Sequence, residues 1–170
     1  MRKDYEIILN LIPENSKVLD IGCSDGELIT YLENKGISAQ GVELNQEKVI
    51  KCLEKGLDVI HGDINLIVED FPFNQFDYCL LTQTIQAVQE PDQLLNTLKK
   101  VSKNIIVSFN NSARLSKISN FLLTGSFDSL LKKANSDHWY NTDYIHPCSI
   151  KDFKKLATDL DLKIISTFDV

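Results

Sequence analysis

The sequence predicts an α/β fold, with a doubly wound, mostly parallel sheet and helices on both of its faces. Short apolar runs suited to buried strands alternate with segments in which apolar residues recur at helical spacing. A turn containing Gly22 and Gly26 joins the first strand directly to a helix, as at the start of a strand–helix–strand unit. A length of 170 residues is enough for one sizeable core, so we expect a single domain over residues 1–170.

The predicted elements alternate along the chain after a first helix that ends at Pro13. The expected strands are residues 18–21, 37–42, 57–61, 76–82, 104–109 and, at the sheet edge, 162–168. The expected helices carry apolar stripes within residues 28–32, 49–53, 94–101 and 115–122, and residues 65–74 form a loop or a short helix.

Helix ends are marked by capping residues. Asp25 and Asn45 are placed to cap the second and third helices, and Pro91 suits a first helical turn. Ser149 and Asp152 have the spacing of a capping box, which predicts a helix near the end of the sequence.

The composition is that of an ordinary globular protein, and it argues against both a nucleic-acid partner and a membrane partner. Apolar residues make up 43% of the chain, and no apolar run approaches the ~20 residues of a membrane span. A net charge of −6 argues against nucleic-acid binding, which usually requires a basic face. The four cysteines form no C-x-x-C pair and the N-terminus turns acidic too early for a signal peptide, so we expect free thiols in the cytoplasm.

The turn after the first strand has the composition of a ligand-binding loop. Residues 17–27 are Lys-Val-Leu-Asp-Ile-Gly-Cys-Ser-Asp-Gly-Glu, and a helix N-terminus behind such a loop favours a phosphate or a carboxylate. The dinucleotide pattern G-x-G-x-x-G fails, since Ser24 replaces its second glycine and Glu27 its third. The spacing fits D-x-G-x-G-x-G with Ser24 as the exception, which is typical of S-adenosylmethionine binders. A turn that binds no ligand is the alternative.

Acidic side chains after the next two strands strengthen this interpretation. Glu43 can accept hydrogen bonds from both hydroxyls of a ribose, and Leu44 beside it is assigned to the same site. Asp63 can accept from an adenine amino group while Ile64 packs on the ring. Asp20 can hold an ammonium group. The joint order of loop and acids predicts a nucleoside with an amino-acid tail, although each acid alone fits a solvated or turn-forming carboxylate.

Several longer stretches resemble a single family over residues 1 to about 168. They are Met1-Arg-Lys-Asp-Tyr5, Val18–Leu28, Gly41–Glu43, Leu81-Thr-Gln-Thr-Ile-Gln-Ala-Val88, Ile105–Phe109 and Trp139–Phe153. On these stretches the chain resembles the MetW family of methionine biosynthesis proteins, within the methyltransferase-like superfamily. The resemblance implies a Rossmann-like class I methyltransferase fold and a site for S-adenosylmethionine or S-adenosylhomocysteine. It also implies a role beside homoserine O-acyltransferase in methionine synthesis.

The chain departs from the family pattern at three places. Ser24 stands where the family usually has glycine, which bears on loop geometry and ligand affinity. Phe109-Asn-Asn-Ser112 replaces the more usual Phe-Pro-Asn-Phe. The family's last strand has no counterpart, so we expect the sheet to lack its last edge strand.

The turn after the fourth strand bears on whether the protein is a catalyst. Small-molecule methyltransferases that resemble this fold often carry an acid and a histidine there, where this chain has Gln86 and Ala87. Neither side chain accepts a proton at neutral pH, but a strong nucleophile needs little acid–base help. Gln83 is expected to hydrogen-bond the ligand's amino-acid end, with a polar loop residue as the alternative, and Cys23 completes the expected site.

Residues 137–146, Asp-His-Trp-Tyr-Asn-Thr-Asp-Tyr-Ile-His, are dense in groups with chemical uses. We expect them at the mouth of the ligand-binding crevice, which lies at the carboxyl ends of the strands. There His138 or His146 is a candidate base, and Tyr140 is a candidate for the wall of an acceptor pocket. The alternative is an aromatic plug over the core, with histidines in structural hydrogen bonds. No metal site is expected, because His138, Asp143, His146 and Cys148 lack a recognised ligand spacing.

Three functions stay open from the sequence. The first is a protein that binds an adenosyl ligand and supports homoserine acylation by a separate acyltransferase. The second is an active S-adenosylmethionine-dependent small-molecule methyltransferase. The third is a scaffold that has lost its ligand, which Ser24 weakly suggests. Copurification with an acyltransferase, transfer of labelled methyl groups and failure to bind either adenosyl ligand would distinguish them.

Overall fold

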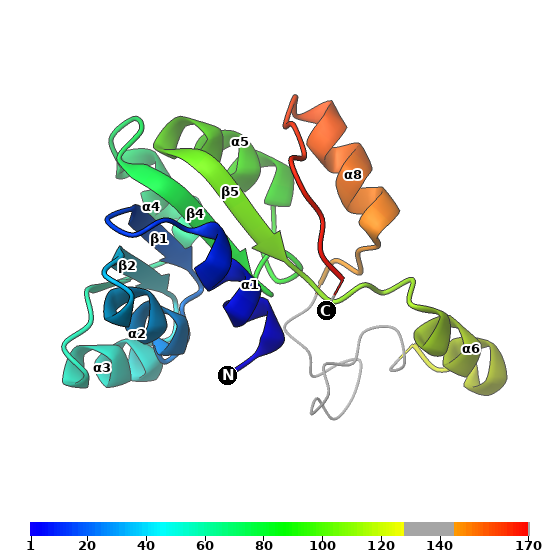
Figure 1. Ribbon diagram of the computed structural model, residues 1–170. Coiled ribbons are helices and arrows are strands. Elements are labelled where there is room, and N and C mark those ends of the chain that lie inside the picture. The colour runs from blue at the N-terminus through cyan, green and yellow to red at the C-terminus, as the bar shows by residue number, and fades with distance from the viewer. Residues whose placement is uncertain (128–144, 170) are drawn as a thin grey trace. The chain divides into compact units, whose positions relative to one another are not determined.

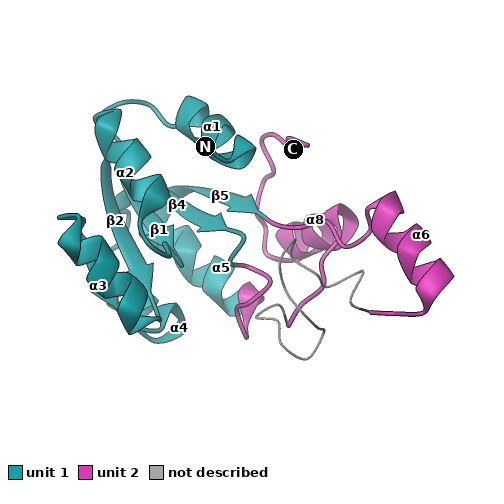
Figure 2. Cartoon of the chain, turned by 90° about the horizontal axis from the view of Figure 1, so that it is seen from below, with its two compact units in different colours: residues 1–84, 93–108, 170 teal, residues 85–92, 109–169 magenta. Residues whose placement is uncertain are grey.

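The computed structural model describes residues 1–127 and 145–169 of the chain. The chain divides into two compact units, which are coloured separately in Figure 2. Unit 1 comprises Met1–Thr84 and Gln93–Ser108, and unit 2 comprises Ile85–Asp92 and Phe109–Asp169. All five strands of the sheet lie within unit 1.

Unit 1 is built on a five-stranded sheet with the strand order β3-β2-β1-β4-β5 (Figure 1). The strands are β1 (Lys17–Ile21), β2 (Ser38–Glu43), β3 (Val59–His61), β4 (Phe76–Thr82) and β5 (Ser102–Ser108). Every neighbouring pair is parallel, which confirms the predicted fold class. These five strands lie within two residues of their predicted positions. Buried apolar runs mark the central strands β1 and β4, while the edge strands β3 and β5 carry apolar runs that are only partly buried.

Helices connect the strands and cover both faces of the sheet. They are α1 (Lys3–Leu11), α2 (Glu27–Asn34), α3 (Gln46–Glu54), α4 (Ile64–Ile67), the 3-10 helix η1 (Val68–Asp70) and α5 (Pro91–Val101). Figure 1 shows α1, α2 and α3 on one face of the sheet and α5 on the other. This is the doubly wound arrangement that strand–helix alternation predicts. No helix in the described part of the chain is long and apolar enough to cross a membrane.

The core of unit 1 holds the helices against the sheet. On the face of α1, α2 and α3 it comprises Tyr5, Ile8, Ile12, Val18, Cys23, Leu28, Ile29, Leu32, Ile37, Ala39, Cys52, Leu57 and Leu80. On α5 the buried residues are Leu94, Leu95, Leu98 and Val101, the predicted apolar stripe. Burying one such leucine or isoleucine contributes about 1.5–3 kcal/mol, so these contacts fix the strand ends that carry the site.

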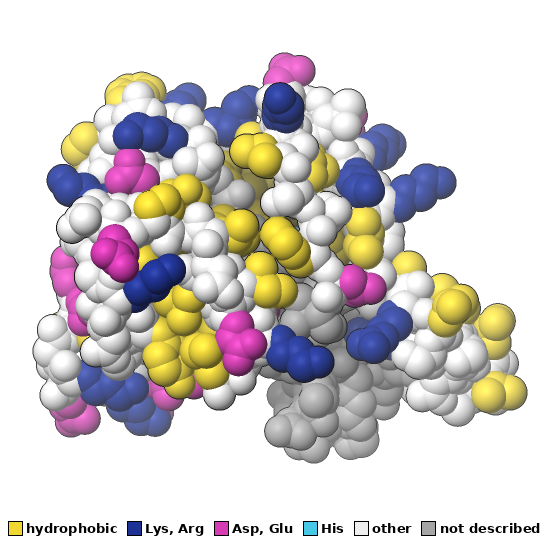
Figure 3. Space-filling view, viewed as in Figure 1, with side chains coloured by type: hydrophobic (Ala, Val, Ile, Leu, Met, Phe, Trp, Pro, Cys, Tyr) yellow, Lys and Arg dark blue, Asp and Glu magenta, His cyan; other side chains and the backbone are white. Residues whose placement is uncertain are grey.

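Unit 2 contains α6 (Leu115–Thr124) and α8 (Ile150–Asp159). The apolar side chains of α6 are exposed at the surface, as Figure 3 shows, and the helix buries none of its residues. The apolar residues within 115–122, from which this helix was predicted, are therefore not part of a core in the described structure.

Two predicted helix caps are confirmed. The Asn45 side chain accepts hydrogen bonds from the N–H groups of Glu47 and Lys48 at the start of α3. Ser149 and Asp152 form the complete capping box at the start of α8. These caps satisfy backbone donors that have no partner within their own helix.

The predicted cap at Asp25 is wrong. The N-cap of α2 is Gly26, which lies in the left-handed region with a φ of 77° and makes no side-chain cap. A Cβ at Gly26 would lie 2.3 Å from Cδ1 of Leu57. The helix therefore begins where close packing against Leu57 demands a glycine, one residue later than a cap at Asp25 would start it.

The predicted edge strand at residues 162–168 is also wrong. The Leu162 N–H donates to the carbonyl of Ala157 at 2.8 Å and closes the end of α8, and residues 163–169 form no strand. The apolar side chains that suggested a strand, Ile164, Ile165 and Phe168, are exposed. Propensity alone does not form a strand, because a strand also needs a hydrogen-bonded neighbour.

Candidate functional site

The carboxyl ends of β1, β2 and β4 define the candidate site. From β1 the chain moves outward to β2 and β3 and then returns to β4 on the other side of β1, so the strand order reverses between β1 and β4. Ligands of open parallel sheets bind beyond the strand ends at such a reversal. Asp20, the loop at residues 22–26, Glu43 and Gln83 all lie at these strand ends, as predicted from the sequence.

Protein contacts fix both glycines of the loop between β1 and α2. Gly22 has a φ of 73°, and its N–H donates to the Val42 carbonyl at 2.8 Å. A Cβ at Gly22 would lie 2.7 Å from Oγ1 of Thr84, just as one at Gly26 would meet Leu57. Both glycines are therefore required by the fold itself, and the glycine pattern alone does not identify a ligand.

Two non-glycine residues of the site also adopt the left-handed region. Ser24 has a φ of 55° and Gln83 a φ of 56°. The Gln83 N–H donates to the Ser108 carbonyl at 2.8 Å, which holds the turn after β4 against β5. Such a conformation costs a non-glycine residue about 1–2 kcal/mol. Ser24 thus keeps the backbone conformation that glycine would adopt more easily.

Glu43 connects the loop after β1 to the turn after β2. The residue is only 8% exposed. One carboxylate oxygen accepts from the Ser24 N–H and the other from the Asn45 N–H, both at 2.8 Å. Each oxygen has a second lone pair, so these bonds orient the carboxylate and still leave it able to accept from ligand hydroxyls.

Asp63 lies at the start of α4, after β3. Its Oδ1 accepts from the backbone N–H of Asn65 at 2.9 Å and from that residue's side-chain amide at 2.8 Å. The turn-forming role considered for Asp63 is therefore present, and its contact with adenine stays a prediction. Of the two apolar residues assigned to the site, Leu44 is 66% exposed and Ile64 is buried. Leu44 therefore offers apolar surface to a ligand.

Asp20 is a buried carboxyl at the end of β1. The residue is 1% exposed, and the Thr82 hydroxyl donates to its Oδ1 at 3.2 Å. Burial raises the pKa of Asp20 to about 7, although the Thr82 bond and the charge of Arg2 lower it in part. Burial also raises the pKa of the Cys23 thiol, which is therefore neutral and unreactive. A cationic group placed against Asp20 would favour its charged form.

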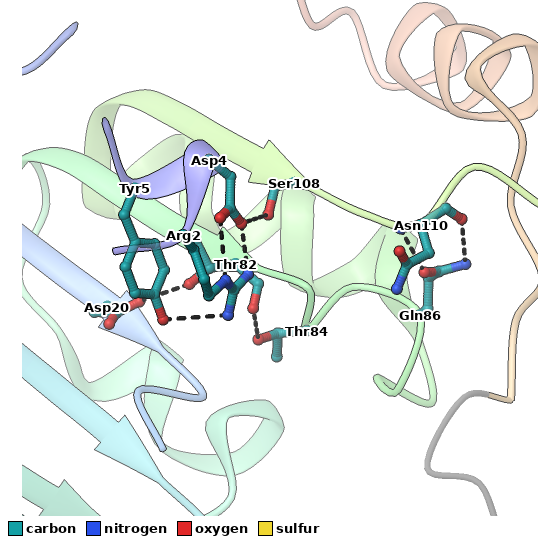
Figure 4. Close-up of polar contacts among 9 residues, drawn as sticks. All are labelled: Arg2, Asp4, Tyr5, Asp20, Thr82, Thr84, Gln86, Ser108 and Asn110. Carbon is teal, nitrogen blue, oxygen red and sulfur yellow. Dashed lines mark hydrogen bonds and ion pairs between the residues drawn. The ribbon is translucent and has the colours of Figure 1, made fainter. Parts of the chain in front are cut away.

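The N-terminal end of α1 brings further polar side chains to the same strand ends (Figure 4). Arg2 forms an ion pair with Asp4, and its Nη1 donates to the Tyr5 hydroxyl at 3.2 Å. The Ser108 hydroxyl, at the end of β5, donates to Asp4 at 3.4 Å. The sequence assigned these residues no role, because no local spacing indicates that α1 reaches the strand ends.

Gln86 has a structural role within unit 2. Its Oε1 accepts from the Asn110 N–H at 3.0 Å, and its Nε2 donates to the carbonyls of Asn110 at 3.2 Å and His146 at 3.4 Å. His146 Nε2 lies 3.1 Å from the Gln89 carbonyl, to which it must donate. The structural alternative considered for His146 is thus supported by a specific hydrogen bond.

The other two candidate catalytic residues, His138 and Tyr140, lie outside the described residues. Within residues 1–127 and 145–169, no three His, Cys, Asp or Glu side chains are grouped so that they could hold a metal ion. The four cysteines are free thiols.

The five-stranded parallel sheet with its helices is the Rossmann-like class I methyltransferase fold. The chain is similar to the crystal structure of an S-adenosylmethionine-dependent methyltransferase from Archaeoglobus fulgidus, with a TM-score of 0.67 and 20% identity over 92% of this chain and 68% of that one. It is similar to another from Methanosarcina mazei, with a TM-score of 0.68 and 18% identity over 91% and 82% of the two chains. At these identities the likeness establishes the fold alone.

The chain belongs to the MetW family. The family model described as methionine biosynthesis protein MetW matches residues 2–170. The bifunctional methionine biosynthesis protein MetXA/MetW of Rhodopirellula baltica is 32% identical over 170 residues, which cover 95% of this chain and 27% of that protein. The chain therefore spans about a quarter of the length of this bifunctional relative. These matches confirm the family resemblance seen in the sequence.

Proposed function

We propose that this chain binds S-adenosylmethionine or S-adenosylhomocysteine and supports homoserine acylation in methionine biosynthesis. The observation that carries the proposal is the position of Glu43, a buried carboxylate at the end of β2 that accepts from the loop residue Ser24. An acid held against a glycine loop beside the strand-order reversal is suited to bind two ribose hydroxyls. The fold shared with S-adenosylmethionine-dependent methyltransferases supports the same ligand class.

Each strand end supplies one part of the proposed recognition. Asp20 binds the ligand's ammonium group, Glu43 its ribose and Asp63 its adenine amino group, while the apolar residues contact the ring. The proposed ligand-binding set is Asp20, Gly22, Cys23, Ser24, Gly26, Glu43, Leu44, Asp63, Ile64 and Gln83.

The proposed partner is a homoserine O-acyltransferase. The Rhodopirellula baltica relative is named as both MetXA and MetW in one chain, and such fusion raises the effective concentration of two proteins that work together. The amide of Gln86 is occupied by structural hydrogen bonds where related methyltransferases often place an acid. A ligand-binding role needs no proton acceptor at this position. Free thiols suit the reducing cytoplasm in which we place the protein.

A second candidate function is methyl transfer to a small molecule. The solved structures that share this fold include S-adenosylmethionine-dependent methyltransferases, which favours it. A strongly nucleophilic acceptor would need positioning more than acid–base catalysis. In this alternative residues 137–146 would wall the acceptor pocket.

Calorimetric titration tests the ligand assignment. We expect saturable binding of S-adenosylhomocysteine and S-adenosylmethionine and none of NAD, whose glycine pattern this loop lacks. A chain that binds neither adenosyl ligand contradicts the proposal. Transfer of labelled methyl groups to small acceptors would instead favour the second candidate.

A further inference from the structure

The first five residues place a cation near a buried acid at the candidate site. Arg2 lies at the start of α1 and Asp20 at the end of β1, and the charge of Arg2 lowers the pKa of Asp20. Tyr5 reaches the same place, with its ring centroid 4.4 Å from Cζ of Arg2. Figure 4 shows the guanidinium of Arg2 bonded to the Tyr5 hydroxyl, and the Asp20 carboxyl bonded to Thr82. All three residues belong to unit 1, so the arrangement does not involve unit 2.

Neighbouring groups hold the guanidinium of Arg2 in one orientation. Its Nε donates to Oδ1 of Asp4 at 3.0 Å, its Nη2 donates to Oδ2, and its Nη1 donates to the Tyr5 hydroxyl. A guanidinium has five N–H groups, so its bonds to the described residues leave two for another acceptor. The Arg2 side chain is 36% exposed, which leaves it accessible to a ligand.

The opposite charges of Arg2 and Asp20 match the two charges of an α-amino acid. The ammonium and carboxylate groups of an amino acid are bonded to the same carbon, so recognising both requires an acceptor and a cation close together. Thr82 gives the Asp20 carboxyl a hydrogen bond but no positive charge. The Arg2 guanidinium can bind a carboxylate through charge-assisted hydrogen bonds.

We propose that Arg2 and Asp20 form a zwitterion site, in which Arg2 binds the carboxylate and Asp20 the ammonium of the adenosyl ligand's amino-acid tail. The inference rests on the proposed function and extends it, because it names the groups that recognise the tail. It makes Arg2 a specificity residue that selects adenosyl ligands with a complete tail over 5′-methylthioadenosine, which lacks one. The competing role for Arg2 is only to anchor α1 through Asp4 and Tyr5.

Titrations with three ligands separate these two roles. The ligands are S-adenosylhomocysteine, decarboxylated S-adenosylmethionine and 5′-methylthioadenosine, which carry the complete tail, an ammonium without a carboxylate, and neither group. We expect Arg2→Ala to weaken binding of S-adenosylhomocysteine by about 10- to 100-fold and to change 5′-methylthioadenosine binding less than about 2-fold. Lys3→Ala, which removes the same charge from an exposed neighbour, should alter neither affinity.

Arg2→Ala must be shown to be folded by thermal unfolding, and the wild-type protein offers a test that needs no variant. Decarboxylated S-adenosylmethionine should bind the wild type about 10- to 100-fold more weakly than S-adenosylmethionine does. Equal affinities for these two ligands, or an equal loss for all three ligands in Arg2→Ala, would overturn the zwitterion site while leaving the proposed function standing. A wild type that binds no adenosyl ligand overturns both.

Discussion

At the scale of single residues, Glu43 combines a structural and a proposed ligand-binding role. Its carboxylate accepts from the N–H groups of Ser24 and Asn45, so Glu43→Ala leaves both donors unpaired. We expect this variant to lose on the order of 2–4 kcal/mol of binding free energy for S-adenosylhomocysteine. We also expect it to lose about 1–3 kcal/mol of stability. Calorimetric titration and chemical unfolding measure the two effects.

The matched control is Glu47→Ala, which removes an exposed carboxylate from the first turn of α3. It should bind the ligand as the wild type does. An unchanged dissociation constant for Glu43→Ala would remove that residue from the site.

Substitutions at Gly22 and Gly36 separate the stability lost through backbone strain from the stability lost through a steric clash. Gly22 and Gly36 both have a φ near 75°, but a Cβ would meet Thr84 at Gly22 and open space at Gly36. The Thr84 hydroxyl donates to the Ile21 carbonyl at 3.0 Å and cannot move away freely. We expect Gly36→Ala to lose about 1 kcal/mol of stability, and Gly22→Ala to lose a further ~1–3 kcal/mol.

Gly22→Val should be the most destabilised of the three variants and should lose ligand binding, because a β-branched residue is poorly suited to this φ. Thermal unfolding with and without S-adenosylhomocysteine measures both effects. Equal losses for Gly22→Ala and Gly36→Ala would show that the Thr84 contact is unimportant.

Asp20 gives the free energy of unfolding a measurable pH dependence. Burial raises its pKa from 3.8 to about 7, and the nearby charge of Glu43 raises it as well, while the Thr82 bond and the charge of Arg2 lower it. Because the folded state binds this proton more tightly than the unfolded chain, Asp20 stabilises the fold fully below about pH 4, and this contribution is lost as the pH rises to about 7. We expect it to be on the order of 4 kcal/mol.

Asp20→Asn removes this titration and keeps the size of the side chain. Chemical unfolding of both proteins at about pH 4.5 and pH 8 measures the effect, since other groups cancel in the comparison. The wild type should lose more stability than the variant between these two values. A constant difference between the proteins would contradict the buried, raised pKa of Asp20.

At the scale of elements, the sequence predicted correctly those strands and helices whose positions follow from the pattern of apolar residues. The five strands were predicted to within two residues. The central strands β1 and β4 are marked by buried apolar runs, and the edge strands β3 and β5 by apolar runs that are only partly buried. The strand at residues 162–168 was predicted wrongly. The β-branched and aromatic residues there have a high strand propensity, but the sequence does not show whether a neighbouring strand is available to pair with them. The start of α2 was misplaced because Asp25 fits a cap locally, whereas the position of Leu57 decides where the helix begins.

Some residues of the candidate site were predicted from the sequence and others were not. Glu43 and Asp63 could be placed at one edge because the carboxyl ends of parallel strands meet there. The cluster at Arg2 was missed because it depends on how α1 packs, and the left-handed conformations of Ser24 and Gln83 are not marked by glycine. Tertiary contacts decide all of these features, and a single sequence carries little sign of them.

The cap of α3 allows a prediction for an element next to the site. The Asn45 side chain accepts from two N–H groups of the helix, while its own backbone N–H donates to Glu43. Asn45→Ala should therefore lose about 0.5–2 kcal/mol of stability and leave the Glu43 contact in place. Asn45→Asp keeps a capping oxygen and should stay close to the wild type in thermal unfolding. A loss in Asn45→Asp as large as in Asn45→Ala would contradict the capping role.

At the scale of the whole molecule, the fold does not by itself decide between binding and catalysis. The strand ends of unit 1 carry the proposed ligand-binding acids, whereas the Gln86 amide in unit 2 is taken up by Asn110 and His146. Functions are built on a fold by particular side chains, and many folds serve several functions. The partner proposal therefore has to be tested by activity in a mixture of two proteins.

We predict that this protein transfers no methyl group to common small acceptors, yet raises homoserine acylation when mixed with its cognate acyltransferase. The physical reason is that Gln86 and Ala87, in the turn after β4, accept no proton at neutral pH, while a relative that is named for both functions joins MetXA and MetW in one chain. Titrating this protein into the purified acyltransferase and following acyl-homoserine formation measures the effect. Arg2→Ala and Glu43→Ala serve as variants that should alter the response to ligand.

If the bound ligand favours one state of the complex, the acylation rate should differ with and without S-adenosylmethionine, because a ligand shifts an equilibrium only by its differential affinity. A rate increase that is indifferent to the ligand would keep the partner role and discard such sensing. No change in rate at saturating protein would contradict the partner role. In that case, transfer of labelled methyl groups by this protein alone would establish the enzyme instead.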